Sequence, residues 1–513
     1  MLNKMFKQID LFLNKITMYR LVIYVLSFYL AGAFVLSFAK VLPYSVVDIL
    51  SSVVFILFVS WFIHLIFSYV YKAPVNVESV YITALILFFI ISPAQGGDYS
   101  HFLMLAFWAS VWSVASKYIF AIGKKHLFNP AAVAVVITAF AINESASWWV
   151  GTPSMLPFVI IGGILVIRKI RRTDLFLSFS ISALATVVIF ALINGGSVAS
   201  TLILTLKNSA FFFFAFIMLT EPLTSPTTKW MRVAFGVLVG ILSAPALHVG
   251  SIYSTPEIAL IIGNIFSYIV SPKDKLILKL KNRILVATDT YDFIFEKSKQ
   301  FYFKAGQYME WTLKHRDVDS RGNRRYFTLA SSPTEPEVHL GVKFYPEPSS
   351  FKNRLLALPI GEEIVASQQA GDFVLPKDKT QGLVFIAGGI GVTPFRSMIQ
   401  YLIDTKEKRN ITILYSNKTI QDVAYKEVFD RAEIELGIKT IHVITNNNQV
   451  PLSAPFIQGP INSNLIIREI PDFQNKVFYI SGPHGMVNAF EETLKSMGVK
   501  DKNIKIDFFP GFA

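Results

Sequence analysis

The chain has 513 residues, of which 53% are apolar and only 16% charged, and its mean hydropathy is +0.48. A soluble globular chain rarely has this composition, so the sequence predicts a membrane protein. It contains no cysteine, which excludes disulfides, thiolate nucleophiles and cysteine-ligated iron–sulfur clusters within the chain.

The formal net charge is +13, and the two halves carry it differently. Residues 1–272 contain 16 Lys or Arg and 8 Asp or Glu, whereas residues 273–513 contain the remaining 32 and 27. Basic loops that face an anionic membrane leaflet account for the excess, so we expect no nucleic-acid partner. The change near residue 272 predicts a membrane domain, residues 1–272, followed by a more polar half.

The first half contains about ten apolar segments of roughly the length that spans a bilayer as a helix. They are predicted at residues 21–38, 46–70, 79–92, 101–120, 130–142, 155–168, 175–194, 199–219, 230–248 and 257–271. Segments 79–92, 130–142 and 155–168 are short for a span, so re-entrant segments stay an alternative there.

Basic residues precede the first predicted span and then follow every second one, as at Lys72, Arg172 and Arg232. Lys and Arg near the ends of spans stay on the cytoplasmic side. We therefore expect a multi-pass protein of the cell (inner) membrane with both termini, and everything after Pro272, in the cytoplasm. No cleavable signal peptide is expected.

After Lys273 the pattern changes to short stretches with apolar residues at every second position, such as LILKLKNRILVAT and YDFIFEK, which is typical of strands. From Gly382 apolar strand runs (LVFIAG, ITILYS, IHVIT, VFYISG) alternate with helical segments. The predicted order is a small β-barrel, residues 273–380, and then a parallel α/β domain, residues 381–513.

Four motifs follow one another in this half: RYFTLAS, GGIGVTPF, SGPHGM and the aromatic tail IDFFPGFA. Together and in this order they resemble the ferredoxin–NADP reductase family, over about residues 275–513. The resemblance implies FAD on the barrel and NAD(P)H on the α/β domain.

RYFTLAS supplies groups that suit a flavin dinucleotide. Arg325 can fork onto a pyrophosphate, and either Tyr326 or Phe327 can lie against the isoalloxazine ring. The Thr328 hydroxyl suits flavin N5, and the family places these groups in these roles. The stretch PSSFKNRL occupies the place where the family cups the pyrophosphate with backbone amides, and its candidates are Ser349, Ser350, Phe351 and Lys352.

GGIGVTPF follows an apolar strand and precedes a helix, so its glycines allow close backbone approach and the helix N-terminus faces an anion. A tight turn without a ligand is the alternative. In the family the Ser481-Gly482-Pro483 turn meets the same crevice, usually with cysteine where Ser481 stands. The predicted nucleotide-binding residues are Gly388, Gly389, Gly391, Thr393, Pro394, Gly482 and Pro483. The choice between NADH and NADPH stays open.

In the family the chain ends with an acid and with an aromatic ring that shields the flavin. Asp507 and Phe512 are the candidates here, and with Thr328 and Ser481 they complete the predicted catalytic set. A frayed apolar tail is the alternative.

Two motifs in the first half, KHLFNPAA (Lys125–Ala132) and LTEPLTSPTT (Leu219–Thr228), resemble the membrane flavin proteins of two electron-transfer complexes. These are the D protein of the Rnf complex and the B protein of the sodium-pumping NADH:quinone oxidoreductase. The resemblance covers about residues 15–272. It implies FMN or riboflavin in the membrane domain, and other electron-transfer subunits as further partners.

A broken helix end at membrane depth offers free backbone groups, which hydrocarbon forbids unless they line a cavity or bind a polar guest. ALILFFIISPAQGG (Ala84–Gly97) resembles AFFFFAFIMLTEP (Ala210–Pro222), which predicts an inverted repeat with one broken helix end on each face. The inner-face flavin site would comprise Asn129, Glu221, Thr224, Ser225, Thr227 and Thr228, and the outer one Ser92, Gln95 and Gly96. A Pro-terminated helix followed by a polar loop is the alternative.

The family commonly attaches FMN covalently through a Thr in a Ser-Gly-Ala-Thr motif. This chain has NESASWWVGTPSMLP in that loop, where Thr152 is the nearest hydroxyl, so covalent attachment stays open. Trp148 and Trp149 are predicted to form an interfacial belt, with a stacking platform as the alternative.

The sequence therefore predicts a membrane flavoprotein oxidoreductase that passes electrons from cytosolic NAD(P)H through FAD to a membrane flavin. The acceptor would be a quinone or an extracytoplasmic molecule, and the lipid bilayer is a further partner. One alternative is a transporter with a redox-sensing flavoprotein domain. The other is a haem-type ferric reductase or NADPH oxidase, for which His64, His101, His126 and His248 supply no paired axial ligands. No metal site is predicted.

Overall fold

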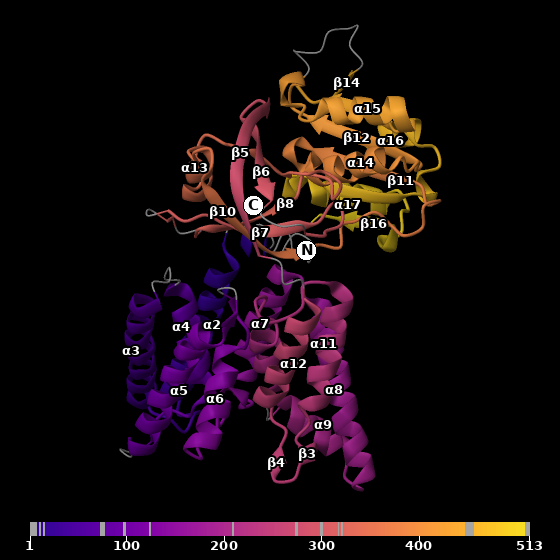
Figure 1. Cartoon of the computed structure of the whole chain (residues 1–513). Coiled ribbons are helices and arrows are strands. Elements are labelled where there is room, and N and C mark those ends of the chain that lie inside the picture. The colour runs from indigo at the N-terminus through magenta and orange to yellow at the C-terminus, as the bar shows by residue number, and fades with distance from the viewer. Residues whose placement is uncertain are drawn as a thin grey trace. The chain divides into compact units, whose positions relative to one another are not determined.

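The computed structural model describes residues 8 to 507 except 10–11, 14–15, 72–76, 96–98, 123–124, 208–209, 272–274, 298–300, 316–317, 320–321 and 447–455. Its contacts divide the chain into two compact units, Met1–Ser271 and Pro272–Ala513 (Figure 1).

The first unit is helical. Its helices are α2 (Met18–Phe38), α3 (Val46–Tyr71), α4 (Val77–Ile90), α5 (Ser100–Ile119), α6 (Pro130–Ala141), α7 (Leu156–Ile170), α8 (Thr173–Ile193), α9 (Val198–Lys207), α10 (Phe211–Phe213), the π-helical turn η2 (Phe214–Met218), α11 (Lys229–Leu242) and α12 (Pro256–Val270). A short 3₁₀ turn, η1, covers Trp149–Gly151. Two hairpins pair β1 (Ala121–Ile122) with β2 (Lys125–His126) and β3 (His248–Val249) with β4 (Ile252–Tyr253).

A helix lies in every range predicted to span the membrane, although range 199–219 is divided between α9 and the α10–η2 segment, which meet at a bend of 59°. Among the described residues four helices, α2, α3, α5 and α8, are long and apolar enough to cross a membrane, or five if the bent pair is one span. α4, α6 and α12 are apolar but shorter. The count of ten spans therefore stays a prediction.

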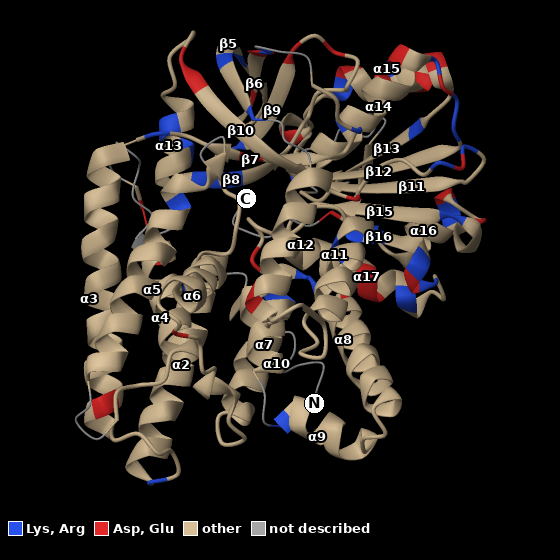
Figure 2. Cartoon of the chain, turned by 60° about the horizontal axis from the view of Figure 1, so that its bottom comes forward, with Lys and Arg blue, Asp and Glu red and all other residues tan. Residues whose placement is uncertain are grey.

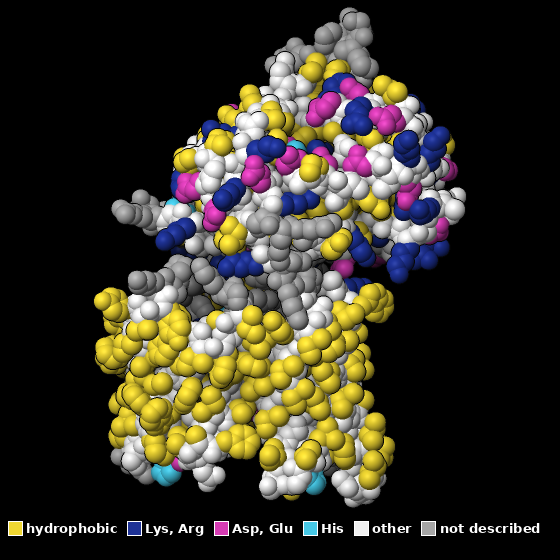
Figure 3. All heavy atoms as spheres, viewed as in Figure 1, with side chains coloured by type: hydrophobic (Ala, Val, Ile, Leu, Met, Phe, Trp, Pro, Cys, Tyr) yellow, Lys and Arg dark blue, Asp and Glu magenta, His cyan; other side chains and the backbone are white. Residues whose placement is uncertain are grey.

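The outer surface of the first unit is apolar. Charged residues are sparse along its helices (Figure 2), and hydrophobic side chains cover the face seen in Figure 3. Large apolar residues such as Phe58, Trp61 and Ile181 are exposed. An exposed apolar surface of this extent is expected where lipid rather than water surrounds a protein.

Helices α6 and α12 begin with the same local signature. Asn129 accepts a hydrogen bond from the Ala132 amide at 3.1 Å, Thr255 accepts one from the Ile258 amide at 3.4 Å, and a proline follows each cap. A side-chain cap followed by Pro at the first helical position satisfies the free amides and presets the helical φ.

The second unit contains two six-stranded sheets. The first has the order β8-β7-β10-β5-β6-β9 and is antiparallel. Its elements are β5 (Leu276–Ala287), β6 (Thr290–Lys297), β7 (Tyr308–Thr312), β8 (Arg324–Thr328), β9 (Val338–Lys343), α13 (Ser350–Leu356) and β10 (Glu363–Ala370). The Ala330 amide donates to the His339 carbonyl at 2.9 Å, so the two edges of the sheet meet and close it around a core that includes Trp311.

The second sheet is parallel, in the order β14-β13-β12-β11-β15-β16. Its elements are β11 (Leu383–Gly388), η3 (Gly389–Val392), α14 (Thr393–Thr405), β12 (Ile411–Asn417), η4 (Ile420–Asp422), α15 (Lys426–Leu436), β13 (Lys439–Ile444), β14 (Phe456–Gln458), α16 (Ser463–Glu469), η6 (Phe473–Asn475), β15 (Val477–Ser481), α17 (His484–Ser496), η7 (Asp501–Asn503) and β16 (Ile504–Ile506). Phe395 of α14 and Phe429 of α15 pack on one face of the sheet, and Leu465 of α16 and Phe490 of α17 on the other. Such a doubly wound sheet has both faces buried, so its strands are almost wholly apolar.

Close packing of α8 on α11 supplies a test of the membrane bundle. A Cβ added at Gly240 would lie 2.7 Å from the Phe179 carbonyl oxygen and 2.0 Å from the Ser182 Oγ. Small residues let membrane helices approach in this way. We expect Gly240→Ala to lower the stability of the detergent-solubilised protein by about 1–3 kcal/mol, because the helices must separate.

Thermal unfolding followed by tryptophan fluorescence measures this change, because of the 7 tryptophans only Trp311 lies beyond residue 272. Gly196→Ala is the control, since the nearest atom to its added Cβ is 3.4 Å away. Equal melting temperatures for the two variants would contradict the packing.

Candidate functional sites

The glycine-rich segment lies at the carboxyl end of β11, beside the end of β15. In the parallel register Ala387 is the partner of Ser481. A Cβ on Gly391 would lie 2.5 Å from the Cα of Gly482, and one on Gly388 would lie 3.2 Å from the Cδ of Pro483. The structure therefore brings the GGIGVTPF and SGP motifs into direct backbone contact, at the edge of the sheet where nucleotides bind in such folds.

After Gly388 the segment continues with Gly389 and then with the N-terminus of α14. Among the described residues, no atom lies within 4 Å of the Cβ position of Gly389, so none of them fills the space in front of it. α14 begins at Thr393 and Pro394, and the Thr393 hydroxyl donates to the Ile390 carbonyl at 3.3 Å. Ile390 also lies next to Gly341 of β9, so this crevice borders the antiparallel sheet.

Ser481 and Asp507 form the predicted pair at the end of β15. The Ser481 hydroxyl donates to the Asp507 Oδ2 at 3.1 Å, and the Asp507 amide donates to the Ile480 carbonyl at 3.0 Å. Phe512, the predicted shield, lies outside the described residues.

The RYFTLAS motif forms β8, and its side chains alternate between two faces. On one face the guanidinium of Arg325 lies 5.5 Å from the ring centre of Phe351, and the ring of Phe327 lies 5.9 Å from the same ring. Arg325 also donates to the Gly322 carbonyl at 3.1 Å and lies 3.8 Å from the Asp319 carboxylate. Three predicted flavin-binding residues thus meet on this face.

Tyr326 and Thr328 lie on the other face of β8. The hydroxyl of Tyr326 donates to Glu310 at 3.0 Å, and its ring packs edge-on against Tyr308 at 5.8 Å. Thr328 is the register partner of Tyr308 and is 5% exposed. Phe327 is buried in the core of the sheet, whereas Tyr326 is only partly buried.

The PSSFKNRL segment forms the start of α13. Ser349 accepts a hydrogen bond from the Lys352 amide at 3.3 Å, and the Ser350 amide donates to Asp319 at 3.0 Å. Asp319 also faces Arg325, so it joins the two predicted flavin-binding segments. Sequence reasoning missed it, because an acid in a polar loop carries no distinctive pattern.

In the first unit a hydrogen-bonded network centres on Glu221, at the end of the broken helix. Its Oε1 lies 3.1 Å from the His126 Nε2, and its Oε2 accepts from the Asn129 amide group at 3.0 Å and from the Thr224 hydroxyl at 3.2 Å. The Ser225 hydroxyl donates to the Glu221 carbonyl at 2.6 Å. Four of the predicted residues, from segments about 90 positions apart, therefore meet (Asn129, Glu221, Thr224 and Ser225).

Three residues that the sequence did not indicate complete this network. Asn264 of α12 accepts from the Asn129 backbone amide at 2.8 Å and donates to the Thr224 carbonyl at 3.1 Å. His126 binds Glu221, and Arg172 binds the Ser225 hydroxyl. Asn264 could have been identified from the sequence, because it is a lone asparagine in an apolar segment. His126 stands within the quoted KHLFNPAA motif.

The segment before the network is a π-helical turn, η2, which inserts an extra residue into the helical turn. Such turns are frequent at functional sites. Thr227 and Thr228 lie outside the Glu221 network: the Thr227 carbonyl accepts from Arg232 at 2.7 Å, and Thr228 precedes α11 without capping it through its side chain.

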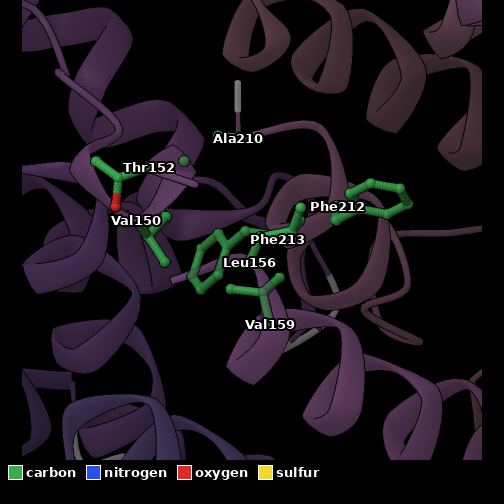
Figure 4. A pocket seen from close by; sticks show the side chains of 8 residues that line it. Val150, Thr152, Leu156, Val159, Ala210, Phe212 and Phe213 are labelled. Atoms are coloured by element: carbon green, nitrogen blue, oxygen red, sulfur yellow. The ribbon is translucent and has the colours of Figure 1, made fainter. Parts of the chain in front are cut away.

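Thr152 lines a small pocket (Figure 4). The pocket is mostly apolar, and its other lining residues are Val150, Gly151, Leu156, Val159, Ala210, Phe212 and Phe213. The Thr152 hydroxyl is 3.4 Å from that of Ser154.

Trp148 and Trp149, in the same loop as Thr152, do not form the predicted interfacial belt. Trp149 is 4% exposed and donates to the Phe88 carbonyl at 2.6 Å, while Trp148 donates to Glu257 at 2.6 Å. Carbonyls at the end of α4 need partners where the helix stops, and the Trp149 side chain provides one. The interfacial-belt expectation was therefore wrong.

The predicted outer residues are only partly described. Ser92 donates to Ser147 at 2.7 Å and accepts from Tyr44 at 3.1 Å. Gln95 is exposed, and Gly96 lies outside the described residues.

Removing the Glu221 carboxylate tests the network. In Glu221→Ala the side chains of His126, Asn129 and Thr224 lose their shared acceptor, and each buried polar group left unpaired costs about 1–3 kcal/mol. We expect a clear fall in the melting temperature measured by tryptophan fluorescence in detergent.

Glu144→Ala is the matched control, since it removes a Glu–His pair of 2.7 Å in which His101 is exposed. Exposed pairs contribute about 0–1 kcal/mol. A fall of the same size in both variants would show that the Glu221 network is not specially stabilising.

Family models match two parts of the chain. Residues 150–273 match the model of the "NQR2, RnfD, RnfE family", and residues 385–492 match the "Oxidoreductase NAD-binding domain".

Curated relatives include the F component of the Na(+)-translocating NADH-quinone reductase of Serratia proteamaculans, 29% identical over 39% of this chain and 52% of the relative. The glycine betaine monooxygenase reductase protein of Chromohalobacter salexigens is 24% identical over 41% of this chain and 56% of the relative. The chain thus spans about half the length of these relatives. A solved structure, the cytochrome P450 reductase GcoB of Amycolatopsis, has a TM-score of 0.41 and 21% identity, covering 47% of this chain and 70% of that one. The two family-model matches confirm both resemblances seen in the sequence, one in each half of the chain.

Proposed function

We propose that the chain is a membrane flavoprotein oxidoreductase that takes a hydride from NAD(P)H in the second unit. By way of FAD, it passes the electrons to a flavin in the first unit, and then to a quinone or an extracytoplasmic acceptor. The nicotinamide and flavin rings, when bound, would supply the redox chemistry, and the residues of the chain would bind and orient them.

The contact between the two nucleotide-binding turns carries this proposal. Gly391 and Gly482 meet at the carboxyl ends of β11 and β15, and no described residue fills the space in front of Gly389. Backbone amides, the N-terminus of α14 and missing side chains together fit a dinucleotide pyrophosphate. Because Ile390 lies against Gly341, the crevice borders the sheet that carries the flavin-binding groups.

The donor set on the antiparallel sheet fits FAD. On β8 a guanidinium (Arg325) and an aromatic ring (Phe327) lie on one face, and a second ring (Tyr326) and a hydroxyl (Thr328) lie on the other. These groups suit, in turn, a pyrophosphate, a flat ring and a ring nitrogen. Phe351, at the start of α13, holds Arg325 and Phe327 in place.

Ser481 and Asp507 provide the polar group beside the nicotinamide. The hydrogen bond to Asp507 fixes the Ser481 hydroxyl next to Gly482. Phe512 keeps its expected role as the ring that shields the flavin.

The Glu221 network supports a flavin in the first unit. It places carboxylate, amide and hydroxyl groups at the broken end of a membrane helix, where a flavin ring edged with donors and acceptors would find partners. Thr152 is our candidate for the anchor of a covalently held flavin, because it is the hydroxyl nearest to the position of the attachment motif.

We also propose that the first unit is an inverted repeat. α3 packs on α5 as α8 packs on α11, and α5 packs on α6 as α11 packs on α12. The shared cap and proline at the start of α6 and α12 agree with this pairing. With its basic loops cytoplasmic, the unit would sit in the inner membrane with the second unit in the cytoplasm, and other electron-transfer subunits would be its partners.

Counting the flavins on the purified full chain tests the function. Denaturing extraction should release FAD and a second flavin, and fluorescence remaining on the polypeptide should disappear in Thr152→Ala if that residue is the anchor. Arg325→Ala should lose FAD and keep the second flavin, because it removes the guanidinium expected on the pyrophosphate. FAD as the sole flavin in the unaltered protein would exclude the two-flavin route.

A single added methyl group tests the nucleotide crevice. In Gly391→Ala the new Cβ would lie 2.5 Å from the Gly482 backbone, so the two turns must separate. We expect the KM for NAD(P)H to rise at least about tenfold in ferricyanide reduction, since misplaced binding groups lose their fit, while the FAD content stays unchanged. Gly485→Ala is the control, because a Cβ added there meets no atom of the described residues within 4 Å. An unchanged KM in Gly391→Ala would place the nucleotide elsewhere.

A further inference from the structure

One face of α14 is polar although the helix is buried. Arg396, Gln400 and Asp404 follow at intervals of four, so they lie on the same side of the helix. Arg396 and Gln400 are 6% and 8% exposed. Buried polar groups need partners, and Arg396 and Asp404 find theirs on the segment that follows β8 in the antiparallel sheet.

Arg396 makes the strongest of these contacts. Its Nη2 donates to the Glu335 Oε1 at 2.8 Å, its Nη1 donates to the other oxygen of the same carboxylate, and Nη1 also donates to the Ala330 carbonyl at 3.0 Å. Such a two-pronged pair fixes direction as well as distance. Burial alone would lower the pKa of Arg396, but the Glu335 carboxylate more than offsets this and raises it, so the guanidinium stays charged.

Two further bonds hold the same segment to the same helix. The Ser397 hydroxyl donates to the Ser331 carbonyl at 2.6 Å, and Thr334 bonds the carboxylate of Asp404. Residues 330–335 are therefore fastened along the length of α14.

The other side of Arg396 faces Tyr425, whose ring centre lies 5.7 Å from the guanidinium carbon. A Cβ on Gly341 of β9 would lie 2.5 Å from the Tyr425 hydroxyl and 2.8 Å from the Thr393 Cγ2. Burial, with the nearby Asp292 carboxylate, raises the pKa of Tyr425 well above its ordinary value, so its hydroxyl stays neutral. The antiparallel sheet thus touches the first residue of α14.

We call the Arg396–Glu335 pair the clamp. Its position relative to the two proposed ligand sites suggests what it does. Ala330 stands two residues after Thr328, and Arg396 follows directly after the GGIGVTPF motif. The clamp therefore joins the strand proposed to hold the flavin to the loop proposed to hold the nicotinamide. A buried ion pair adds little net stability, because removing both charges from water offsets their attraction, so stability alone does not explain it.

We propose that Arg396 and Glu335 are positioning residues that set the distance between the two ligand sites and so control hydride transfer, without touching either ligand. This inference rests on the proposed function. Hydride transfer oxidises NAD(P)H and reduces FAD, and its rate falls steeply when the two reacting atoms are displaced: about 1 Å costs on the order of 100-fold.

The test compares Arg396→Met, Arg396→Lys and Glu335→Gln with Arg409→Met in the purified full chain. Arg409 is the matched control, because its side chain is 6% exposed, against 8% for that of Arg396, and it pairs with Glu407 at 2.6 Å. It also donates to the Pro376 carbonyl at 2.9 Å, so its partners stand in the loops before β11 and before β12 and not in the segment after β8. Flavin reduction by NADH is followed at about 450 nm in anaerobic stopped flow, together with FAD content, the apparent Kd for NADH and the deuterium isotope effect with 4-deuterated NADH.

We expect Arg396→Met to slow flavin reduction by about 10- to 100-fold, with FAD content unchanged, the Kd for NADH little changed and a larger isotope effect. Glu335→Gln should also slow flavin reduction, because it removes the negative charge that holds the Arg396 guanidinium in its two-pronged pair. Arg396→Lys should recover part of the rate, since it keeps the charge but not the fork. Arg409→Met should reduce flavin at the rate of the unaltered chain.

Gly341→Ala provides a test that keeps every charge. Its added methyl group pushes against Thr393 and Tyr425, and it should also slow flavin reduction at unchanged FAD content. Normal reduction in both Arg396→Met and Gly341→Ala would overturn this inference alone, as would loss of FAD in parallel with the rate. Absence of flavin reduction by either NADH or NADPH in the unaltered chain would overturn the proposed function as well.

Discussion

The first unit depends on one constraint: a backbone that leaves its helix among apolar residues must find new hydrogen-bond partners. Each peptide group left unpaired there costs on the order of several kcal/mol. After η2 the chain leaves the helix at Leu219, and the side chains that meet it come from α12 and from the segment before α6. Asn264 accepts from one backbone segment and donates to another, and Glu221 collects the side chains of three neighbours. The break is stable because these partners converge on it, and the same convergence makes it suited to a polar guest.

The second unit makes its site in the opposite way, by leaving side chains out. Strands β11 and β15 satisfy their backbone bonds with each other along their length. At their carboxyl ends the bonding stops, and two glycines let the turns touch. The glycine turn and the N-terminus of α14 stand at this edge, where nucleotide sites usually form in parallel sheets.

α14 connects this space to the neighbouring sheet. Its first turn borders the crevice, and its buried polar face holds the segment after β8 through Arg396 and Ser397. One helix therefore contacts both of the proposed ligand sites. If the second unit donates electrons to the first, as proposed, joining them in one chain keeps the two at a high effective concentration, whatever the affinity between them.

Local patterns in the sequence were sufficient for much of the architecture. Apolar runs located a helix in every predicted range, and alternation followed by strand–helix repeats separated the antiparallel sheet from the parallel one. The motifs identified the residues on both sides of the crevice, as well as Asn129, Glu221, Thr224 and Ser225. These features depend on residues within a few positions of one another, so a single sequence shows them.

Contacts between distant segments were decided only by the tertiary structure. Asn264 stands 135 residues from Asn129, and Arg396 stands 61 from Glu335, so neither pairing leaves a local pattern. Trp149 is a further example. A tryptophan near the end of a predicted span suggested a membrane interface, but packing placed its side chain against the end of α4. The sequence by itself determined which segments are helices, strands and glycine turns, since periodicity and backbone preference act locally. Only folding decided which polar side chains meet, because the cost of burying an unpaired group is settled by partners from elsewhere in the chain.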